Sequence, residues 1–354
     1  PQPGSNLLTA ADVDDNLNFS FFGQYLIRIA DQYGQSSLPS PDLSSRTIVS
    51  VLDEQGRPVV NAVVRSGEST AYSNPDGVAY LYGSSDATAT VTSADGSITT
   101  EVAIDDGRAE VNLDYQSVAA SGLDLAIVLD TTGSMGDELA FLTKEFESIV
   151  RRTADAHPEA SLRFALIVYR DVGDQYVTRT FDFTDDPTEI AGQLAEQFAD
   201  GGGDYPEAVD AALADAVKLN WRSDVSRALI LNADAPPHTE RAAAALASAN
   251  ELGELGVRIY PLAASGVADE AEYLFRIMAA RTGGRYLFLT NDSGIGNEKA
   301  EPKVQCYVVT SLNDLLVRVL DTELSLGRAE PTDDQVIRTV GSYTSGVCAE
   351  PGQD

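Results

Sequence analysis

One segment of the sequence places oxygen-bearing side chains at a spacing that suits a metal ion. The range Leu123 to Met135 reads LDLAIVLDTTGSM, so an apolar run ends in Asp130 and is followed by Thr132 and Ser134. Hard divalent cations such as Mg2+ prefer carboxylate and hydroxyl oxygens to sulfur or imidazole. The same residues have a simpler interpretation, because any one of them could cap the helix that follows.

This segment resembles the metal-ion-dependent adhesion site of von Willebrand factor A (VWA) domains, whose first loop is D-x-S-x-S. Asp130, Thr132 and Ser134 fill those positions, and Thr in place of the first Ser keeps the hydroxyl. The family takes two further ligands from later loops, commonly a Thr and then an Asp that ends the next central strand. The resemblance therefore implies a VWA fold with a divalent-cation site.

Two later segments match the remaining loops of that family. GGGDYPEAVDAAL offers Asp204 where the Thr would stand, and ALILNADAPPH offers Asp234 after an apolar strand. Asp204 has an alternative role as the cap of a helix beginning at Pro206, in which case Glu207 could take the metal role. The second loop is thus the point at which this sequence departs from the family.

The resemblance implies a role for each ligand. Thr132 and Ser134 would coordinate the ion directly, while Asp130 and Asp234 would balance its charge directly or through water. Asp204 in place of a neutral Thr makes the site more negative, so the ion is held more tightly but attracts an acidic partner less. The open position would accept water or an Asp or Glu of a partner protein. Mg2+ is the expected ion, with Mn2+ or Ca2+ as alternatives.

Other polar residues near these loops are weaker candidates. Asp171 and Asp174 could line the rim and hold a second cation, although a solvated turn also explains them. His238 could be a general base or a ligand, but a loop histidine beside two prolines is more often structural. The only other histidine is His157, and no GxSxG or phosphate-loop motif occurs. We therefore expect no enzyme, with a metal-assisted hydrolase as the less favoured alternative.

The elements that position these residues alternate between strand and helix over residues 120–326. Such alternation predicts an α/β fold with a doubly wound, mostly parallel sheet and helices on both faces. In open sheets of this kind ligands bind beyond the carboxyl ends of the strands, where Asp130 and Asp234 fall. We take 120–326 as the VWA domain.

The chain before this domain is expected to have two parts. In residues 1–45, a capping box of Thr9 and Asp12 predicts one helix to about Gln32, followed by a Ser- and Pro-rich linker. Residues 46–116 alternate apolar and polar side chains between turns, which predicts an antiparallel β-sandwich. This region resembles the carboxypeptidase regulatory-like and Cna B-type sandwiches. We expect it to act as a spacer or docking platform.

The remaining residues, 327–354, form a polar tail that is expected to pack back on the VWA body. Cys306 and Cys348 either form a disulfide that ties the tail to this body or are two inert thiols. VWA proteins with β-sandwich companions are usually exported, so we favour the disulfide.

The charge and hydropathy of the sequence exclude some classes of partner. The formal net charge of −31 repels phosphate backbones and anionic lipid, so no nucleic-acid binding is expected. No apolar run is long enough to span a membrane, and no signal peptide is present. The Pro-Gln-Pro-Gly start resembles a trimmed end, so a leader or lipid anchor could have been removed.

These observations predict an exported, adhesion-type module in which a VWA-held divalent cation recruits an acidic group of a partner protein. The expected location is extracellular, at the cell surface or in the periplasm. The alternative is a structural or regulatory subunit of a cell-envelope assembly.

Overall fold

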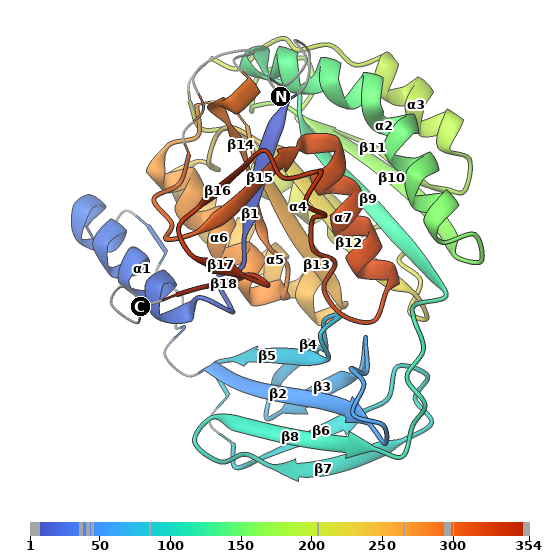
Figure 1. Ribbon diagram of the computed structural model, residues 1–354. Helices are drawn as coiled ribbons and strands as arrows, with labels where there is room; N and C mark the ends of the chain where they lie inside the picture. Colours follow the sequence, from blue (N-terminus) through green and yellow to red (C-terminus); the bar gives the residue numbers. More distant parts are fainter. Residues whose placement is uncertain are drawn as a thin grey trace.

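The computed structural model describes residues 8–34, 38–39, 43, 46–84, 86–203, 205–264, 266–293, 299 and 301–349, apart from the side chains of Asp137 and Ser293. Within these residues the chain forms an α/β unit and a small β-sandwich, which lies below the α/β unit in Figure 1.

A nine-stranded sheet is the centre of the α/β unit, in the order β11-β10-β9-β12-β13-β14-β1-β15-β16. The strands are β1 (Thr9–Val13), β9 (Gly122–Asp130), β10 (Ser161–Tyr169), β11 (Thr178–Thr184), β12 (Ser226–Ala233), β13 (Val257–Ala263), β14 (Tyr286–Thr290), β15 (Tyr307–Ser311) and β16 (Arg338–Val340). The five from β10 to β14 in that order are parallel, whereas β11 and β1 run antiparallel to their neighbours. The predicted mostly parallel α/β fold is confirmed.

Helices cover both faces of this sheet. They are α1 (Phe19–Tyr33), α2 (Gly136–Ala156), α3 (Pro187–Ala195), α4 (Val209–Val217), α5 (Ala242–Glu254), α6 (Asp269–Thr282) and α7 (Leu312–Leu324). One apolar core joins the sheet to α2, α3 and α7, and a second joins the other face to α1, α4, α5 and α6. Among the described residues no helix has both the length and the apolar character to cross a bilayer.

The N-terminal segment differs from the predicted helical extension. Thr9–Val13 is a strand of the large sheet, pairing with β14 on one side and β15 on the other, and the helix begins only at Phe19. All five strand residues are buried, so non-local pairing overrides the local capping pattern. The Asp12 side chain, expected in a capping box, instead forms ion pairs with Arg285, Arg318 and Arg328.

The β-sandwich consists of two sheets in the orders β5-β2-β8 and β4-β3-β6-β7. Its strands are β2 (Arg46–Asp53), β3 (Val63–Ser66), β4 (Ser69–Tyr72), β5 (Val78–Tyr82), β6 (Thr88–Thr92), β7 (Thr99–Ala103) and β8 (Arg108–Leu113). The pairs are antiparallel except for β2 and β8, which run parallel. The two small sheets enclose an apolar core of their own. The resemblance to Cna B-type sandwiches stays a prediction.

The sandwich packs against the edge of the α/β unit where the parallel strands begin. Asn61 donates to Ser226 Oγ at 3.2 Å and accepts from Arg258 at 3.1 Å. The Arg258 guanidinium in turn donates to Glu323 of α7 at 2.7 Å, and both charged side chains are fully buried. This network joins the sandwich to β12, β13 and α7.

The C-terminal tail packs on the α/β unit as predicted. β16 pairs with β15, and the short strands β17 (Tyr343–Thr344) and β18 (Val347–Cys348) form a hairpin. Cys306 and Cys348 form a disulfide, with a Cα–Cα distance of 5.4 Å. The expected disulfide is therefore confirmed.

Candidate metal centre

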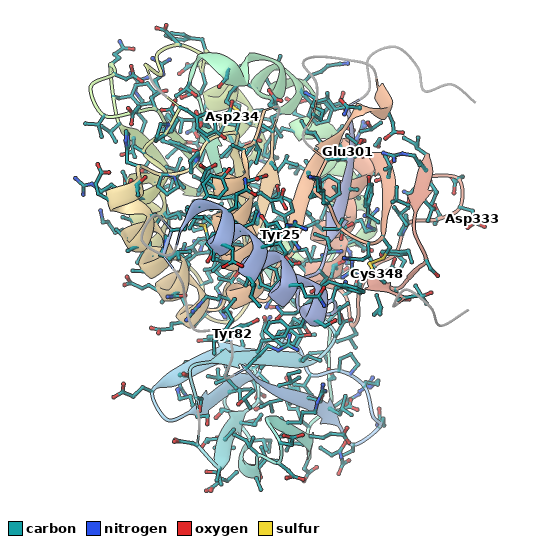
Figure 2. All side chains as sticks on the ribbon, turned by 90° about the vertical axis from the view of Figure 1, so that its left-hand side faces the viewer. Tyr25, Tyr82, Asp234, Glu301, Asp333 and Cys348 are labelled. Carbon is teal, nitrogen blue, oxygen red and sulfur yellow. A yellow bond between two sulfur atoms is a disulfide. The ribbon has the colours of Figure 1, made fainter. Side chains whose placement is uncertain are left out.

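The candidate ligands meet at the carboxyl ends of the central strands. β9 lies between β10 and β12 in the sheet. The chain leaves β9 toward α2 on one face and leaves β12 toward α5 on the other, so a crevice forms at the carboxyl ends of these two strands. Asp130 is the last residue of β9, Tyr169 is the last of β10, and Asp234 directly follows β12. Figure 2 shows Asp234 near the top of the α/β unit, well away from Tyr82 at the upper edge of the sandwich.

The first loop is organised by one oxygen of Asp130. Its Oδ1 accepts hydrogen bonds from the backbone N–H of Thr132 at 2.8 Å and from the Thr132 hydroxyl at 2.7 Å. The other oxygen, Oδ2, is buried and has no hydrogen bond of standard geometry among the described residues, although the nearby Tyr169 hydroxyl lowers the pKa of Asp130. A buried carboxylate oxygen without a donor is costly, so a cation is a natural partner for this oxygen.

Ser134 lies where the first loop enters its helix. It is in a short 3-10 turn, Gly133–Met135, that leads directly into α2, and its side chain is exposed. Its hydroxyl forms a hydrogen bond that lowers the pKa of Asp234. The structure therefore brings the first loop and the Asp234 loop together.

The second loop reaches the site through Glu207. Asp204 lies outside the described residues, and α4 begins at Val209, so Pro206 does not open that helix as predicted. Glu207 is 4% exposed, and its Oε2 has no hydrogen-bond partner among the described residues. The backbone of Gly202, with a φ of 72°, packs so closely that a Cβ there would lie 2.8 Å from Glu207 Oε1. The glycine run allows the loop to close over this carboxylate.

The three buried carboxyl groups repel one another. Burial, followed by the charge of Asp234, raises the pKa of Asp130 to about 7. Burial, followed by the charge of Asp130, raises the pKa of Glu207 to about 9. Burial also raises the pKa of Asp234. A cation at this point would relieve the repulsion and satisfy the unpaired oxygens, so the residues present fit a divalent ion.

The carboxylates alone do not form a complete set of ligands. Within the described part of the chain no three Asp, Glu, His or Cys side chains are grouped closely enough to hold a metal ion. An ion here would need the hydroxyls of Thr132 and Ser134 and several waters, as Mg2+ commonly does. These side chains line a solvent-open hollow together with Gly202, Tyr205, Glu207 and Asp234.

The predicted rim residues have mostly structural contacts. Asp174 accepts hydrogen bonds from the backbone N–H groups of Gly202 at 2.9 Å and Asp171 at 3.2 Å, which ties two loops together. Asp171 pairs with His238 Nε2 at 2.8 Å. A second cation at Asp171 and Asp174 stays a prediction.

Two residues near the site were missed by the sequence analysis. Tyr169 is buried, and its pKa is raised by burial and then by the charges of Asp130, Asp234 and Glu207. Glu138, near the start of α2, is close enough to raise the pKa of Asp234. Their only sequence signal is a polar group at the end of an apolar strand or in the first turn of a helix.

Residues 124–291, which form most of the α/β unit, match the von Willebrand factor A domain family. The chain is 28% identical over 179 residues to Alpha-protein kinase vwkA of Dictyostelium discoideum, covering 49% of this chain and 28% of that protein. It is 35% identical over 129 residues to an ariadne-like RING finger protein of Acanthamoeba polyphaga mimivirus, covering 36% and 12% of the two chains.

A match to Hemicentin-2 of Mus musculus, 32% identical over 103 residues, covers 29% of this chain and 2% of that protein. The chain thus spans 28% or less of the length of each of these relatives. Among solved structures, BatB from Bacteroides thetaiotaomicron aligns with a TM-score of 0.36 and 18% identity, covering 50% of this chain and 92% of that chain.

Proposed function

We propose that this chain is a protein-binding module whose VWA domain uses a divalent cation to bind an acidic group of its partner. The observation that carries the proposal is a pair of buried carboxylate oxygens at the carboxyl edge of the sheet, Asp130 Oδ2 and Glu207 Oε2, which have no hydrogen bond of standard geometry among the described residues. VWA domains usually bind proteins, and the candidate site opens to solvent beside Tyr205 and Ser134.

We assign the ion to Asp130, Thr132, Ser134 and Asp234, with Glu207 as the contribution of the second loop. Asp204 remains an alternative for that loop. Mg2+ suits this set of oxygen donors best, and Mn2+ or Ca2+ are alternatives. When bound, the ion would supply an open coordination position for a partner carboxylate.

The charge of the site limits the strength of that bond. Three ionised carboxylates around a divalent ion leave one net negative charge, which weakens the attraction for a further carboxylate. We therefore expect a single carboxylate to bind weakly, so that additional contacts of the partner supply affinity and specificity.

We propose binding rather than catalysis, because the hollow is open to water and His238 is paired with Asp171 at 2.8 Å. The Cys306–Cys348 disulfide supports an oxidising location outside the cytosol. A structural subunit of a cell-envelope assembly would use the same face, and would differ only in the identity of the partner.

The experiment measures carboxylate binding at the ion without knowledge of the partner. Nα-acetyl-aspartate amide is added to chelator-stripped protein with Mn2+, and the paramagnetic relaxation of its protons is recorded by NMR. We expect enhanced relaxation in wild type and in the control Asp182→Asn, an exposed carboxylate of β11, but not in Asp130→Asn. Equal relaxation in Asp130→Asn, or bound Mn2+ that leaves the probe unaffected, would refute the proposal.

A further inference from the structure

A second hollow lies beside the candidate cation site and has a different chemistry. It is lined by aromatic, proline and aliphatic side chains with one carboxylate, among them Tyr33, Tyr205, Pro236, Pro237, Leu274 and Glu270. We call it the Tyr205–Glu270 pocket. Its walls suit the hydrocarbon part of a side chain, and its carboxylate suits a positive charge.

Tyr205 forms the wall between this pocket and the candidate cation site, since it lines both. Its hydroxyl donates to the backbone oxygen of Asp234 at 2.9 Å and accepts from the backbone N–H of Ala268 at 2.7 Å. The ring is thereby fixed between the Asp234 loop and the start of α6, although 42% of the residue is exposed.

The backbone also fixes the two hollows relative to each other. The segment from Asp234 to Pro237 supplies a candidate ligand at one end and pocket wall at the other. The segment from Tyr205 to Glu207 does the same, and the backbone N–H of Glu207 donates to the Pro236 oxygen at 2.9 Å. A ligand that occupies both hollows therefore meets a preformed geometry.

Glu270 determines the chemistry of the occupant. It is the second residue of α6, is partly buried, and has no ion pair among the described residues. Burial, followed by the charge of Glu270, raises the pKa of the Tyr33 hydroxyl, which also forms a hydrogen bond with Glu270, so the partner of this carboxylate is neutral. An uncharged aliphatic side chain would cover this carboxylate without a counter-ion, which is unfavourable.

A lysine or arginine side chain would satisfy both parts of the pocket. Its hydrocarbon stem would lie along the prolines and the Tyr205 ring, and its charged end would meet Glu270, with the tyrosine faces adding a cation–π contribution. The net charge of −31 would also attract a basic segment at long range.

We propose that the Tyr205–Glu270 pocket binds a Lys or Arg side chain of the partner protein, close in sequence to the acidic residue that reaches the cation. One aromatic side chain separates the hollows, so the two partner residues would lie within about three positions, or roughly 10 Å of extended chain. This inference rests on the proposed function for its second part, the acidic residue.

The pocket is tested first without metal. Nα-acetyl-lysine amide and Nα-acetyl-norleucine amide, which lacks the ammonium group, are titrated into the full chain in EDTA and followed by saturation-transfer NMR. We expect the lysine probe to bind about fivefold more tightly, as a partly exposed ion pair would provide.

Glu270→Gln should remove this preference. Asp269→Asn, which deletes the same charge at the neighbouring exposed residue, should keep it. Equal binding of the two probes by wild type, absence of binding by both, or an equal loss in the two variants would overturn the proposal.

The link to the cation site is tested with the peptides Ac-Asp-Gly-Lys amide and Ac-Asn-Gly-Lys amide. In Mg2+ the Asp peptide should bind about tenfold more tightly than the Asn peptide, and in EDTA the two should bind equally. If the lysine preference holds but Asp adds nothing in Mg2+, the pocket stands and the proposed function fails. If Asp adds affinity but lysine does not, the proposed function stands and the pocket assignment fails.

Discussion

The two oxygens of Asp130 have opposite environments. One oxygen organises the first loop through Thr132, while the other is buried without a hydrogen bond of standard geometry among the described residues. An isolated protein domain would be more stable with a neutral group here, so we interpret the carboxylate as retained for an ion. Stability and binding should therefore respond in opposite directions when its charge is removed.

We predict that Asp130→Asn stabilises the metal-free protein by about 1–3 kcal/mol at pH 8, because it removes an unpaired buried charge. The same substitution should abolish the rise in unfolding temperature that Mg2+ gives wild type. Thermal unfolding by circular dichroism, with and without Mg2+, measures both effects. Asp182→Asn serves as the control and should respond to Mg2+ like wild type; a Mg2+-dependent rise in Asp130→Asn would contradict the assignment.

We predict that the metal-free protein loses stability as pH rises from about 5.5 to 8. The pKa of Asp130 is raised to about 7 and that of Glu207 to about 9, from ordinary values of 3.8 and 4.5. The folded state therefore binds more protons than the unfolded state throughout this window, so the free energy of unfolding falls as pH rises. Carboxyl groups whose pKa is lowered, such as Asp12, titrate below this window.

Urea unfolding in EDTA at pH 5.5 and 8 measures this difference directly. Glu207→Gln should flatten the pH dependence of the unfolding free energy, because the variant lacks one of the two carboxyl groups that hold an extra proton in the folded state. Saturating Mg2+ should flatten it as well, by stabilising the ionised carboxylates. A free energy of unfolding that rises with pH in EDTA would be inconsistent with these shifts.

Among the elements, β1 depends most on distant parts of the chain. It lies within the sheet between β14 and β15, as Figure 1 shows, although these strands are more than 270 residues away in sequence. Its Asp12 is buried against Arg285, Arg318 and Arg328. Burial alone would raise the pKa of Asp12, but the three guanidinium groups outweigh this effect and lower the pKa.

We predict that Asp12→Ala lowers the free energy of unfolding by about 3–5 kcal/mol, since buried arginines lose their shared counter-ion. Asp31→Ala, at an exposed position near the end of α1, should change it by less than about 0.5 kcal/mol. Urea unfolding of both variants gives the comparison. A cost below about 1 kcal/mol for Asp12→Ala would show that the ion pairs do not hold β1 in place.

The sequence predicted the elements whose signals are local. Apolar runs that end in Asp130 and Asp234 identified two central strands, and the parallel arrangement then placed both residues at one edge. β1 was mistaken for a helix start because its partners are set by tertiary pairing. The Tyr205–Glu270 pocket has no local signal either, since its walls come from α1, α5, α6 and several loop segments that are distant in sequence.

At the scale of the whole molecule, the two ends have separate tasks. The sandwich joins the edge where parallel strands begin, through Asn61 and Ser226, whereas the candidate site lies at the opposite edge. The disulfide attaches the C-terminal hairpin to the start of β15, and Figure 2 shows Cys348 well away from Asp234. The disulfide should thus affect stability and leave ion binding unchanged.

We predict that replacing both cysteines (Cys306→Ser with Cys348→Ser) lowers the free energy of unfolding by up to about 4 kcal/mol. The cysteines are separated by 42 positions, and closing a loop of that length restricts the unfolded chain. The magnitude follows from the chain-entropy estimate. Urea unfolding tests the loss, and Mg2+ titration of the same variant should give an unchanged affinity. A changed affinity would mean that the tail and the site are coupled.

The central claim is that one divalent cation is held by Asp130 and its neighbours. The most direct test is calorimetric titration of Mg2+ into chelator-stripped wild type and Asp130→Asn at pH 8, where Asp130 is ionised. We expect saturable binding of one ion by wild type and none by the variant. Equal binding by both proteins, or only diffuse, salt-sensitive association with the acidic surface, would contradict the assignment of this site.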